Sequence, residues 1–302
     1  MTHAPLIHPL PHPIDLLALQ QHDPARFPLL MESTASGTAQ GRWSLLLAAQ
    51  GEGLRLDADG QVRDLHDAVQ PGTFLQALDR AWQAERLPHD GSHSLPFRGG
   101  WALMLDYEVA SQIEPVLPAR AREDGRPTAL ALRCPAAVLH DHQNDASFVI
   151  AEAGEHALLE TLVTLASQAL PEAGQGWQPP QSVGEDAPQR FTDGVRRVIE
   201  YLRAGDVFQV NLSRRWNAQF AAPVSPQALY AQLRRANPAP LPACSARTAA
   251  MWSVPRRSGW CRCTPAMRRP VRLPVPVHAS KATTMPRASR NWSVTPRSAP
   301  ST

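Results

Sequence analysis

Residues 204–216 read AGDVFQVNLSRRW and are the most regularly patterned stretch of this 302-residue chain. Polar and apolar residues alternate from Val207 onward, which predicts a strand over residues 207–216. Gly205 stands where a left-handed residue would end the preceding helix. Asp206 is the last acidic residue of the whole chain. The composition of the protein therefore changes inside its best-patterned segment.

The charge of the chain divides at the same point. Residues 1–206 hold all 27 acidic residues and 15 of the 30 basic ones, a net charge of −12. Residues 207–302 hold the other 15 basic residues and no acid. Such an asymmetry is typical of a basic segment that binds nucleic acid, so a globular domain with a nucleic-acid-binding tail is one hypothesis. The basic part has no known nucleic-acid-binding motif, which disfavours that partner.

No segment of the sequence predicts a membrane location. The start, MTHAPLIHPLPHPI, lacks the basic and apolar regions of a signal peptide, and no apolar run approaches the ~20 residues of a membrane span. Cys134 lies among apolar residues and is expected in the core, whereas the other three cysteines lack zinc-type spacing. We therefore expect a cytoplasmic protein without a membrane span and without metal ligands of its own.

The first 240 residues mix predicted strands and helices without a regular β-α-β order, which indicates an α+β fold. The predicted strands are residues 28–33, 42–49, 54–62 with a turn at Asp59-Gly60, 97–107, and two within 128–151 that turn at Asn144-Asp145. The predicted helices are residues 73–85, 155–170, 195–204 and 226–236, the last with Ser225 as N-cap and Pro226 at its first position.

The chain is expected to have four parts. Residues 1–170 form an N-terminal domain, residues 171–188 a linker of turn residues, and residues 189–240 the start of a second domain. Residues 241–302 form a basic tail with nine prolines and no Phe, Ile or Tyr. Such a composition buries too little apolar surface to offset the entropy of ordering, so these last 60 or so residues are expected to be disordered.

Residues 191–240 resemble component I of aminodeoxychorismate synthase and of anthranilate synthase, two chorismate-utilising enzymes. The family signature is a helix, then A-G-D-x-F/Y-Q-V-N-L-S-x-R, then a helix that ends in N-x-A/S-P-F. Residues 204–215 and 237–240 match it here. Residues 30–43 resemble the family element L-L-x-S…x-R-aromatic, and residues 95–100 resemble L-P-F-x-G-G.

The resemblance covers about residues 14–240 and implies antiparallel sheets with helices outside, of which this chain would supply an incomplete set. It also implies a site for chorismate, a dianion whose amination needs cations or Mg²⁺ and a positioned acid and base. A glutamine amidotransferase, component II, would supply the ammonia.

Four residues match binding positions of the family. Asn211 matches an asparagine near the chorismate ring, and Gln209 lies on the same predicted strand face. Both could instead be structural amides. Ser33 and Arg42 match positions near a pocket for tryptophan, which inhibits some family members and is a structural ligand in others. A turn-capping serine and an exposed arginine are the alternatives.

The catalytic motifs that follow N-x-A-P in the family are missing from this chain. They include S-P-E-R, P-I-A/K-G-T and the carboxylates that hold Mg²⁺. Consider a shifted reading frame, in which each codon consists of the last base of one codon and the first two bases of the following codon. This frame can encode S-P-E-R-L across residues 251–261, P-I-A-G-T across 269–279 and K-E-R-A-E-H from Val294. We interpret residues 241–302 as translated out of frame, which explains why the carboxylates stop. No catalytic residue and no Mg²⁺ ligand is expected in the chain itself.

These features favour component I of aminodeoxychorismate synthase, inactive as this chain, because Q-V-N-L-S is closer to that enzyme than the Q-V-V-P-S of anthranilate synthase. One observation favours anthranilate synthase: the slipped codon across Leu273-Pro274 cannot encode the lysine of P-I-K-G-T. An inactive remnant that keeps the tryptophan-type pocket is a further hypothesis.

Overall fold

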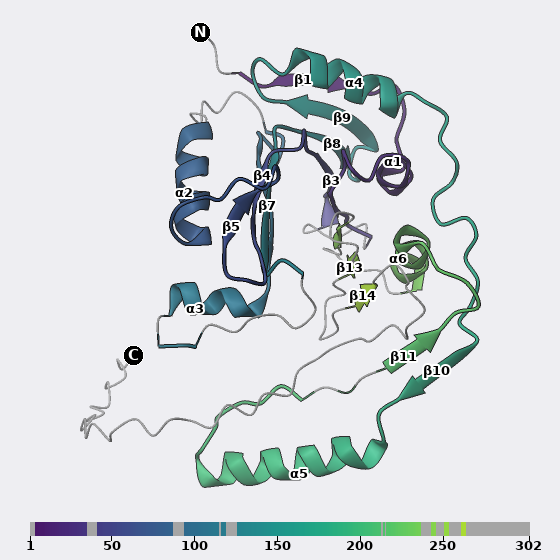
Figure 1. Ribbon diagram of the computed structural model, residues 1–302. Helices are drawn as coiled ribbons and strands as arrows, with labels where there is room; N and C mark the ends of the chain where they lie inside the picture. The colour runs from purple at the N-terminus through teal and green to yellow at the C-terminus, as the bar shows by residue number, and fades with distance from the viewer. Residues whose placement is uncertain are drawn as a thin grey trace, which may run out of the picture. The chain divides into compact units, whose positions relative to one another are not determined.

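A computed structural model describes most of the first 245 residues (Figure 1). The described residues are 4–34, 41–86, 94–114, 116–118, 126–212, 214, 216–236 and 243–245, with the backbone of 251–253 and 261–263. They fall into two compact units, one that runs to Gly184 and resumes at Trp216, and one that begins at Glu185 and includes Arg214. No helix among the described residues is long and apolar enough to cross a membrane.

The first unit contains a six-stranded antiparallel sheet in the order β1-β9-β8-β3-β2-β12. Its strands are β1 (Leu6–Pro9), β2 (Leu29–Met31), β3 (Trp43–Ala48), β8 (Ala136–Asp141), β9 (Ala146–Ala151) and β12 (Ala243–Ser245). The predicted turn at Asn144-Asp145 joins β8 to β9 and places Asp145 at a φ of 49°. The α+β class and the antiparallel pairing expected from the sequence are thus confirmed.

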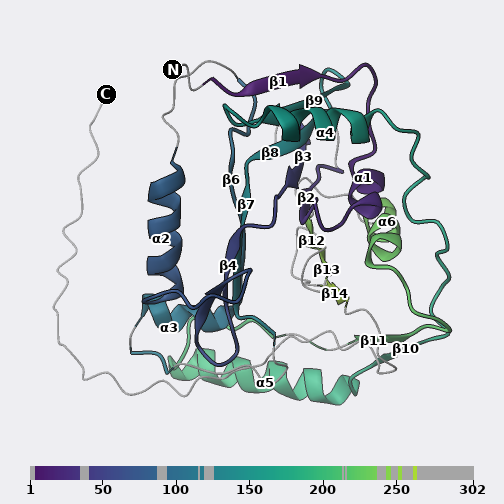
Figure 2. The same cartoon turned by 45° about the horizontal axis from the view of Figure 1, so that its top comes forward.

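Three helices cover this sheet. They are α1 (Leu16–His22), α4 (His156–Ala166) and α6 (Pro226–Ala236). Figure 2 shows α4 along β9 and β1, and α1 beside α6. Leu17, Leu30, Val138, Leu162 and Tyr230 meet in the apolar core beneath them. The sheet and its helices therefore join residues from both ends of the described chain.

A second sheet of the same unit has the order β5-β4-β7-β6. Its strands are β4 (Gly53–Leu56), β5 (Val62–Asp64), β6 (Gly100–Leu105) and β7 (Ala129–Cys134). The helix α2 (Phe74–Glu85) packs on it and begins with a capping box between Thr73 and Gln76. The short helices η2 (Tyr107–Val109) and α3 (Ala110–Ile113) follow β6.

Residues 128–151 form three strands rather than the predicted two. Pro135 alone separates β7 from β8, and these strands belong to different sheets. A proline cannot donate to a strand ladder, so the chain leaves one sheet and enters the next at this residue. Cys134 is fully buried at the end of β7, as its apolar surroundings predict.

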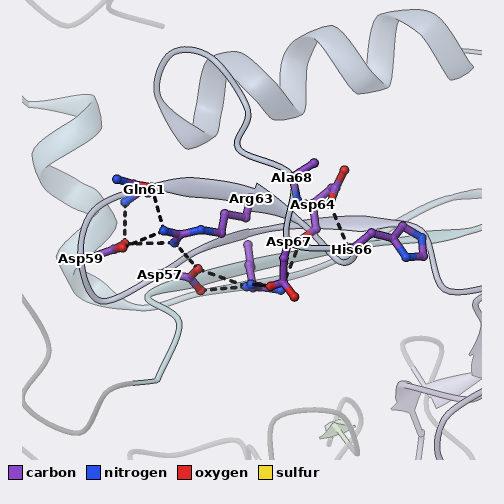
Figure 3. A network of polar contacts seen from close by, with 9 residues as sticks. Asp57, Asp59, Gln61, Arg63, Asp64, His66, Asp67 and Ala68 are labelled. Carbon is purple, nitrogen blue, oxygen red and sulfur yellow. Dashed lines mark hydrogen bonds and ion pairs between the residues drawn. The ribbon is translucent and has the colours of Figure 1, made fainter.

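The β4–β5 hairpin carries a network of charges around its tight turn (Figure 3). Arg63 bonds to Asp57 at 2.6 Å and to Asp59 at 2.9 Å. Arg55 bonds to Asp57 at 2.9 Å and also pairs with Asp67. The Asp67 and Asp59 carboxylates are largely exposed, so the network orders the turn without adding much stability.

The second unit contains α5 (Pro188–Ala204), which ends at Gly205 with the predicted left-handed conformation, φ 78°. The strand predicted over residues 207–216 is wrong for residues 207–212, which bend at Phe208 and pair with no described strand. Alternation of side chains fixes only the two faces of a strand, and a hydrogen-bonded neighbour is also needed. The next strand along the chain, β11 (Trp216–Gln219), begins after this segment and pairs with β10 (Ser182–Glu185).

The observed units differ from the predicted division of the chain. β10 lies inside the predicted linker 171–188, and α6 and β12 belong to the first unit. Disorder from residue 241 is wrong for β12, because its residues pair with β2 and bury Cys244 completely. Farther along, β13 (Met251–Ser253) pairs with β14 (Cys261–Cys263). The rest of the predicted tail lies outside the described residues.

Candidate functional site

The two predicted substrate-binding residues lie in the second unit. Gln209 and Asn211 are exposed and lie in residues 206–212, the segment that follows α5. The side chain of Leu212 packs against α5 at Gly194. A Cβ atom added to Gly194 would lie 3.0 Å from a Cδ atom of Leu212. This contact holds the end of the segment against α5 and leaves both amide side chains available to solvent.

Ser33 and Arg42 lie in the first unit, where the ends of β2 and β3 come together. Ser33 is buried, and its hydroxyl donates to the carbonyl oxygen of Trp43 at 2.9 Å. Its backbone N–H donates to the Ser44 hydroxyl at 2.9 Å, and that hydroxyl bonds to Nε2 of His142 at 2.7 Å. The structure therefore ties Ser33 into the sheet rather than leaving it as a simple turn cap.

The charge of Arg42 is paired with a buried carboxylate across the sheet. Its Nη2 lies 2.7 Å from Oδ2 of Asp141, and its Nε donates to the same carboxylate at 3.1 Å. The guanidinium also lies 4.9 Å from the ring centre of Trp43. The Arg42 side chain remains 44% exposed, whereas that of Asp141 is 3% exposed. A planar cation on an indole ring at the surface is suited to binding a ligand, and its bonds to Asp141 through Nε and Nη2 fix its position.

Hydrogen bonds hold the Asp141 carboxylate in its charged form. The bonds from Arg42 lower the pKa of Asp141 to about 2, with further help from the Gln143 backbone N–H and the Asn144 amide, against the effect of burial. The neighbouring imidazole of His142 has a lowered pKa, first because it is partly buried and then because His140 lies beside it. The charge of this region is thus concentrated in the Arg42–Asp141 pair.

Replacing Asp141 by Asn is expected to remove an acid-sensitive part of the stability. Because the folded pKa of about 2 lies below the ordinary value of 3.8, the carboxylate stabilises the fold above pH ~5, and this contribution is lost as the pH falls toward 2. The shift corresponds to about 2 kcal/mol at pH 7. The free energies of unfolding of Asp141→Asn and the parent, measured in urea, should differ by at least that amount at pH 7 and become equal near pH 2.

The matched control is Asp145→Asn, which removes an exposed carboxylate from the same turn. Its stability is expected to stay within about 0.5 kcal/mol of the parent at both pH values, as for most surface substitutions. A gap between Asp141→Asn and the parent that does not change with pH would contradict the assignment of the acid-sensitive stability to this carboxylate.

An ion network that the sequence analysis missed fixes α6 beside Ser33. Arg234 bonds to Glu32 at 2.8 Å and to Asp15 at 3.1 Å, and the Tyr230 hydroxyl donates to Glu32 at 3.0 Å. Burial opposes the charge of Arg234, but its two carboxylate partners outweigh this effect and raise its pKa. Because Glu32 and Arg234 are 202 positions apart, no local spacing could have paired them.

The described residues do not fit a magnesium site. No group of three or more His, Cys, Asp or Glu side chains among them could hold a metal ion. The sequence beyond residue 206 offers no carboxylate at all. We therefore assign no step to a metal bound by this chain.

The family model for chorismate binding enzyme matches residues 29–248. The chain belongs to this family. The match confirms the resemblance stated from the motifs, and it includes both Ser33 and Arg42 as well as the 204–216 segment.

The curated relatives of this chain bear two names. Aminodeoxychorismate synthase component 1 of Streptomyces lividans is 27% identical over 226 residues, which cover 70% of this chain and 44% of the relative. Anthranilate synthase component 1 of Pseudomonas putida is 27% identical over 237 residues, covering 70% and 46%. The chain thus spans less than half the length of these curated relatives.

A solved structure is similar in fold. The crystal structure of anthranilate synthase component I from Streptococcus pneumoniae TIGR4 matches with a TM-score of 0.54 and 21% sequence identity. The match covers 72% of this chain and 51% of that chain. The antiparallel sheets with outer helices described above are therefore the fold of this family.

Proposed function

We propose that the gene encodes component I of an aminodeoxychorismate synthase, which replaces the C4 hydroxyl of chorismate by ammonia from a cytoplasmic glutamine amidotransferase partner. The observation that carries the proposal is the run Gln209-Val210-Asn211-Leu212-Ser213, which is closer to that enzyme than to anthranilate synthase. A relative of that name supports it. Anthranilate synthase component I is the second candidate, because several relatives bear that name.

We also propose that this 302-residue chain does not itself convert chorismate. The reaction needs an acid or base at the reacting carbon and cations for two carboxylates. The family glutamate of S-P-E-R and the Mg²⁺ carboxylates have no counterpart after Asp206. Asn211 and Gln209 would then be substrate-binding residues in a site that lacks its acid or base and its Mg²⁺ ligands.

The Ser33–Arg42 region is proposed to keep the tryptophan-type pocket of the family. Support comes from the half-exposed Arg42 guanidinium over the Trp43 ring and from the fixed position of Ser33 at the end of β2. A zwitterionic amino acid could offer its carboxylate to Arg42 and stack its indole on apolar neighbours. Isothermal titration of the chain with tryptophan, with Arg42→Met as comparison, would test this part.

The test of the proposed activity is a gene whose frame is corrected near codon 240. The corrected protein is expected to convert chorismate with ammonia to aminodeoxychorismate, identified by mass spectrometry, whereas the 302-residue chain should give no product above the uncatalysed rate. Anthranilate as the product would favour the second candidate. Absence of any product from a folded, corrected protein would overturn the proposed function.

A substitution in the corrected protein tests the role of Asn211. Asn211→Ala is expected to lower kcat/KM by about tenfold or more, because a lost hydrogen bond to a bound charged substrate is worth about 1.5–3 kcal/mol. Asn217→Ala, which removes the same amide from the neighbouring strand β11, is the matched control. Equal activity of the two variants would remove Asn211 from the substrate site.

A further inference from the structure

The helix α5 is strongly amphipathic yet buries none of its 17 residues. Its polar face carries Thr192, Asp193, Arg196, Arg197, Glu200 and Arg203. The opposite face carries Phe191, Val195, Val198, Ile199 and Leu202. A stripe of this width is the pattern of a helix that packs one side into a core.

Part of this apolar face is already covered from within the unit. Leu212 packs at Gly194, and the guanidinium of Arg214 lies 6.0 Å from the ring centre of Phe191. Arg214 also pairs with Glu185 at 3.0 Å. The segment after Gly205 therefore runs back along one flank of the helix.

Within the second unit, the described residues leave the other flank partly exposed. Val195, Ile199 and Leu202, spaced as neighbours along one stripe, are 37%, 41% and 40% exposed. Phe208, in the segment that follows, is 96% exposed. Four large apolar side chains so close in sequence mark a contact surface rather than scattered surface residues. We call these four residues the α5 face.

The length of the relatives indicates what covers the α5 face. The match to each of the two relatives described above accounts for 44% and 46% of that relative, and the family match ends at residue 248. More than half of each relative therefore has no counterpart in the matched part of this chain. The amphipathic face lies in the very block, residues 191–215, that agrees best with the family signature.

We propose that the α5 face is the docking surface for the second half of the family fold, and that this half binds the chain when it is supplied as a separate polypeptide. The inference rests on the proposed function, because that half is the product of the corrected frame beyond codon 240. The apolar side chains of the second half would complete the core of which α5 forms one wall. Its binding would bury Phe208 and the apolar stripe of α5.

The experiment coexpresses the 302-residue chain with the polypeptide encoded in the corrected frame from codon 241 to its stop codon. The expected result is a one-to-one complex on size exclusion, in which residues 191–212 gain protection from hydrogen exchange. Ile199→Asp should weaken this complex about tenfold or more, because an apolar anchor would become a buried charge. Glu200→Gln, on the polar face of the same helix, is the matched control and should bind like the parent.

Several results would overturn the proposal. The two polypeptides could fail to associate, or Ile199→Asp could bind as well as Glu200→Gln. The chain could instead form a dimer that Ile199→Asp dissociates, which would make a second copy the occupant. Finally, Ile199→Asp could destabilise the chain alone, which would mean that its own first unit covers the face.

The proposed function fails separately, and the two failures can be told apart. If the corrected single polypeptide yields no chorismate product while the two pieces still associate through Ile199, the activity is wrong and the docking surface stands. If the corrected polypeptide is active but the pieces do not associate, the docking proposal alone is wrong.

Discussion

Gly99→Ala should cost the first unit about 4–6 kcal/mol, a large part of the 5–15 kcal/mol typical of a whole protein. A Cβ at this position would lie 1.7 Å from Oε1 of Glu152 and 2.4 Å from its Cδ. The backbone of Gly99 also has a φ of 101°, where a side chain is strained by about 1–2 kcal/mol. Both effects act on the same residue.

The Glu152 carboxylate cannot yield to the added methyl group without breaking a buried ion pair. It lies 2.5 Å from Nη2 of Arg133, whose Nη1 donates to the carbonyl oxygen of Gly100 at 3.1 Å. The two side chains are 6% and 11% exposed, and they connect β7 of one sheet to the end of β9 in the other. Separating this pair leaves the buried Glu152 carboxylate without its ion-pair partner, at a cost of about 3–5 kcal/mol.

Thermal unfolding followed by circular dichroism measures the effect. A loss of this size corresponds to a fall in Tm of about 10–20 °C for a domain of this length. Gly184→Ala is the control, because nothing lies within 4 Å of a Cβ at that position. If Gly99→Ala melts within a few degrees of Gly184→Ala, the ion pair has more freedom than these contacts allow.

Local signals in the sequence predicted the elements of the fold well. The Asp59-Gly60 hairpin turn, the helix that begins after Thr73, the left-handed Gly205 and Pro226 at the start of α6 all appear where the sequence placed them. Each of these signals acts within a few residues, through a turn conformation or a capping bond. Such features can be recognised before any tertiary contact is known.

Features that depend on distant residues were not predictable in the same way. Arg42 and Asp141 are 99 positions apart, and Tyr230 and Glu32 are 198 apart. The alternation over residues 207–212 predicted a strand, but a strand also requires a neighbour, and the described residues supply none. The amide side chains of Gln209 and Asn211 are exposed in the second unit, so the proposed substrate role of this segment rests on its sequence motif.

The predicted tail differs most from its expectation at residues 243–245, which form the edge strand of the six-stranded sheet. The edge of β2 offers backbone N–H and C=O groups, which any residue except proline can pair with in both directions. Ala243, Cys244 and Ser245 meet Met31, Leu30 and Leu29, and only Cys244 points into the core, where a small side chain suffices. A sheet edge therefore accepts a segment whose composition alone predicts disorder.

A chain that stops after Pro242 is accordingly expected to be about 3–5 kcal/mol less stable than one that stops after Thr248, the last residue of the family match. The shorter chain loses β12 and exposes Leu30. It also deprives the fully buried Gln20 of two partners, since its Nε2 donates to the Cys244 carbonyl at 3.1 Å and its Oε1 accepts from the Cys244 thiol at 2.9 Å. An unsatisfied buried amide alone costs about 1–3 kcal/mol.

Urea unfolding of the two truncated chains measures this difference, and a point substitution separates its causes. Cys244→Ser keeps the backbone pairing and a donor toward Gln20, so it should retain most of the stability that the shorter chain loses. Cys244→Asp puts a charge among buried apolar side chains and should unfold at a urea concentration close to that of the shorter chain. If all four proteins unfold together, β12 contributes nothing to the sheet, and the first unit ends at α6.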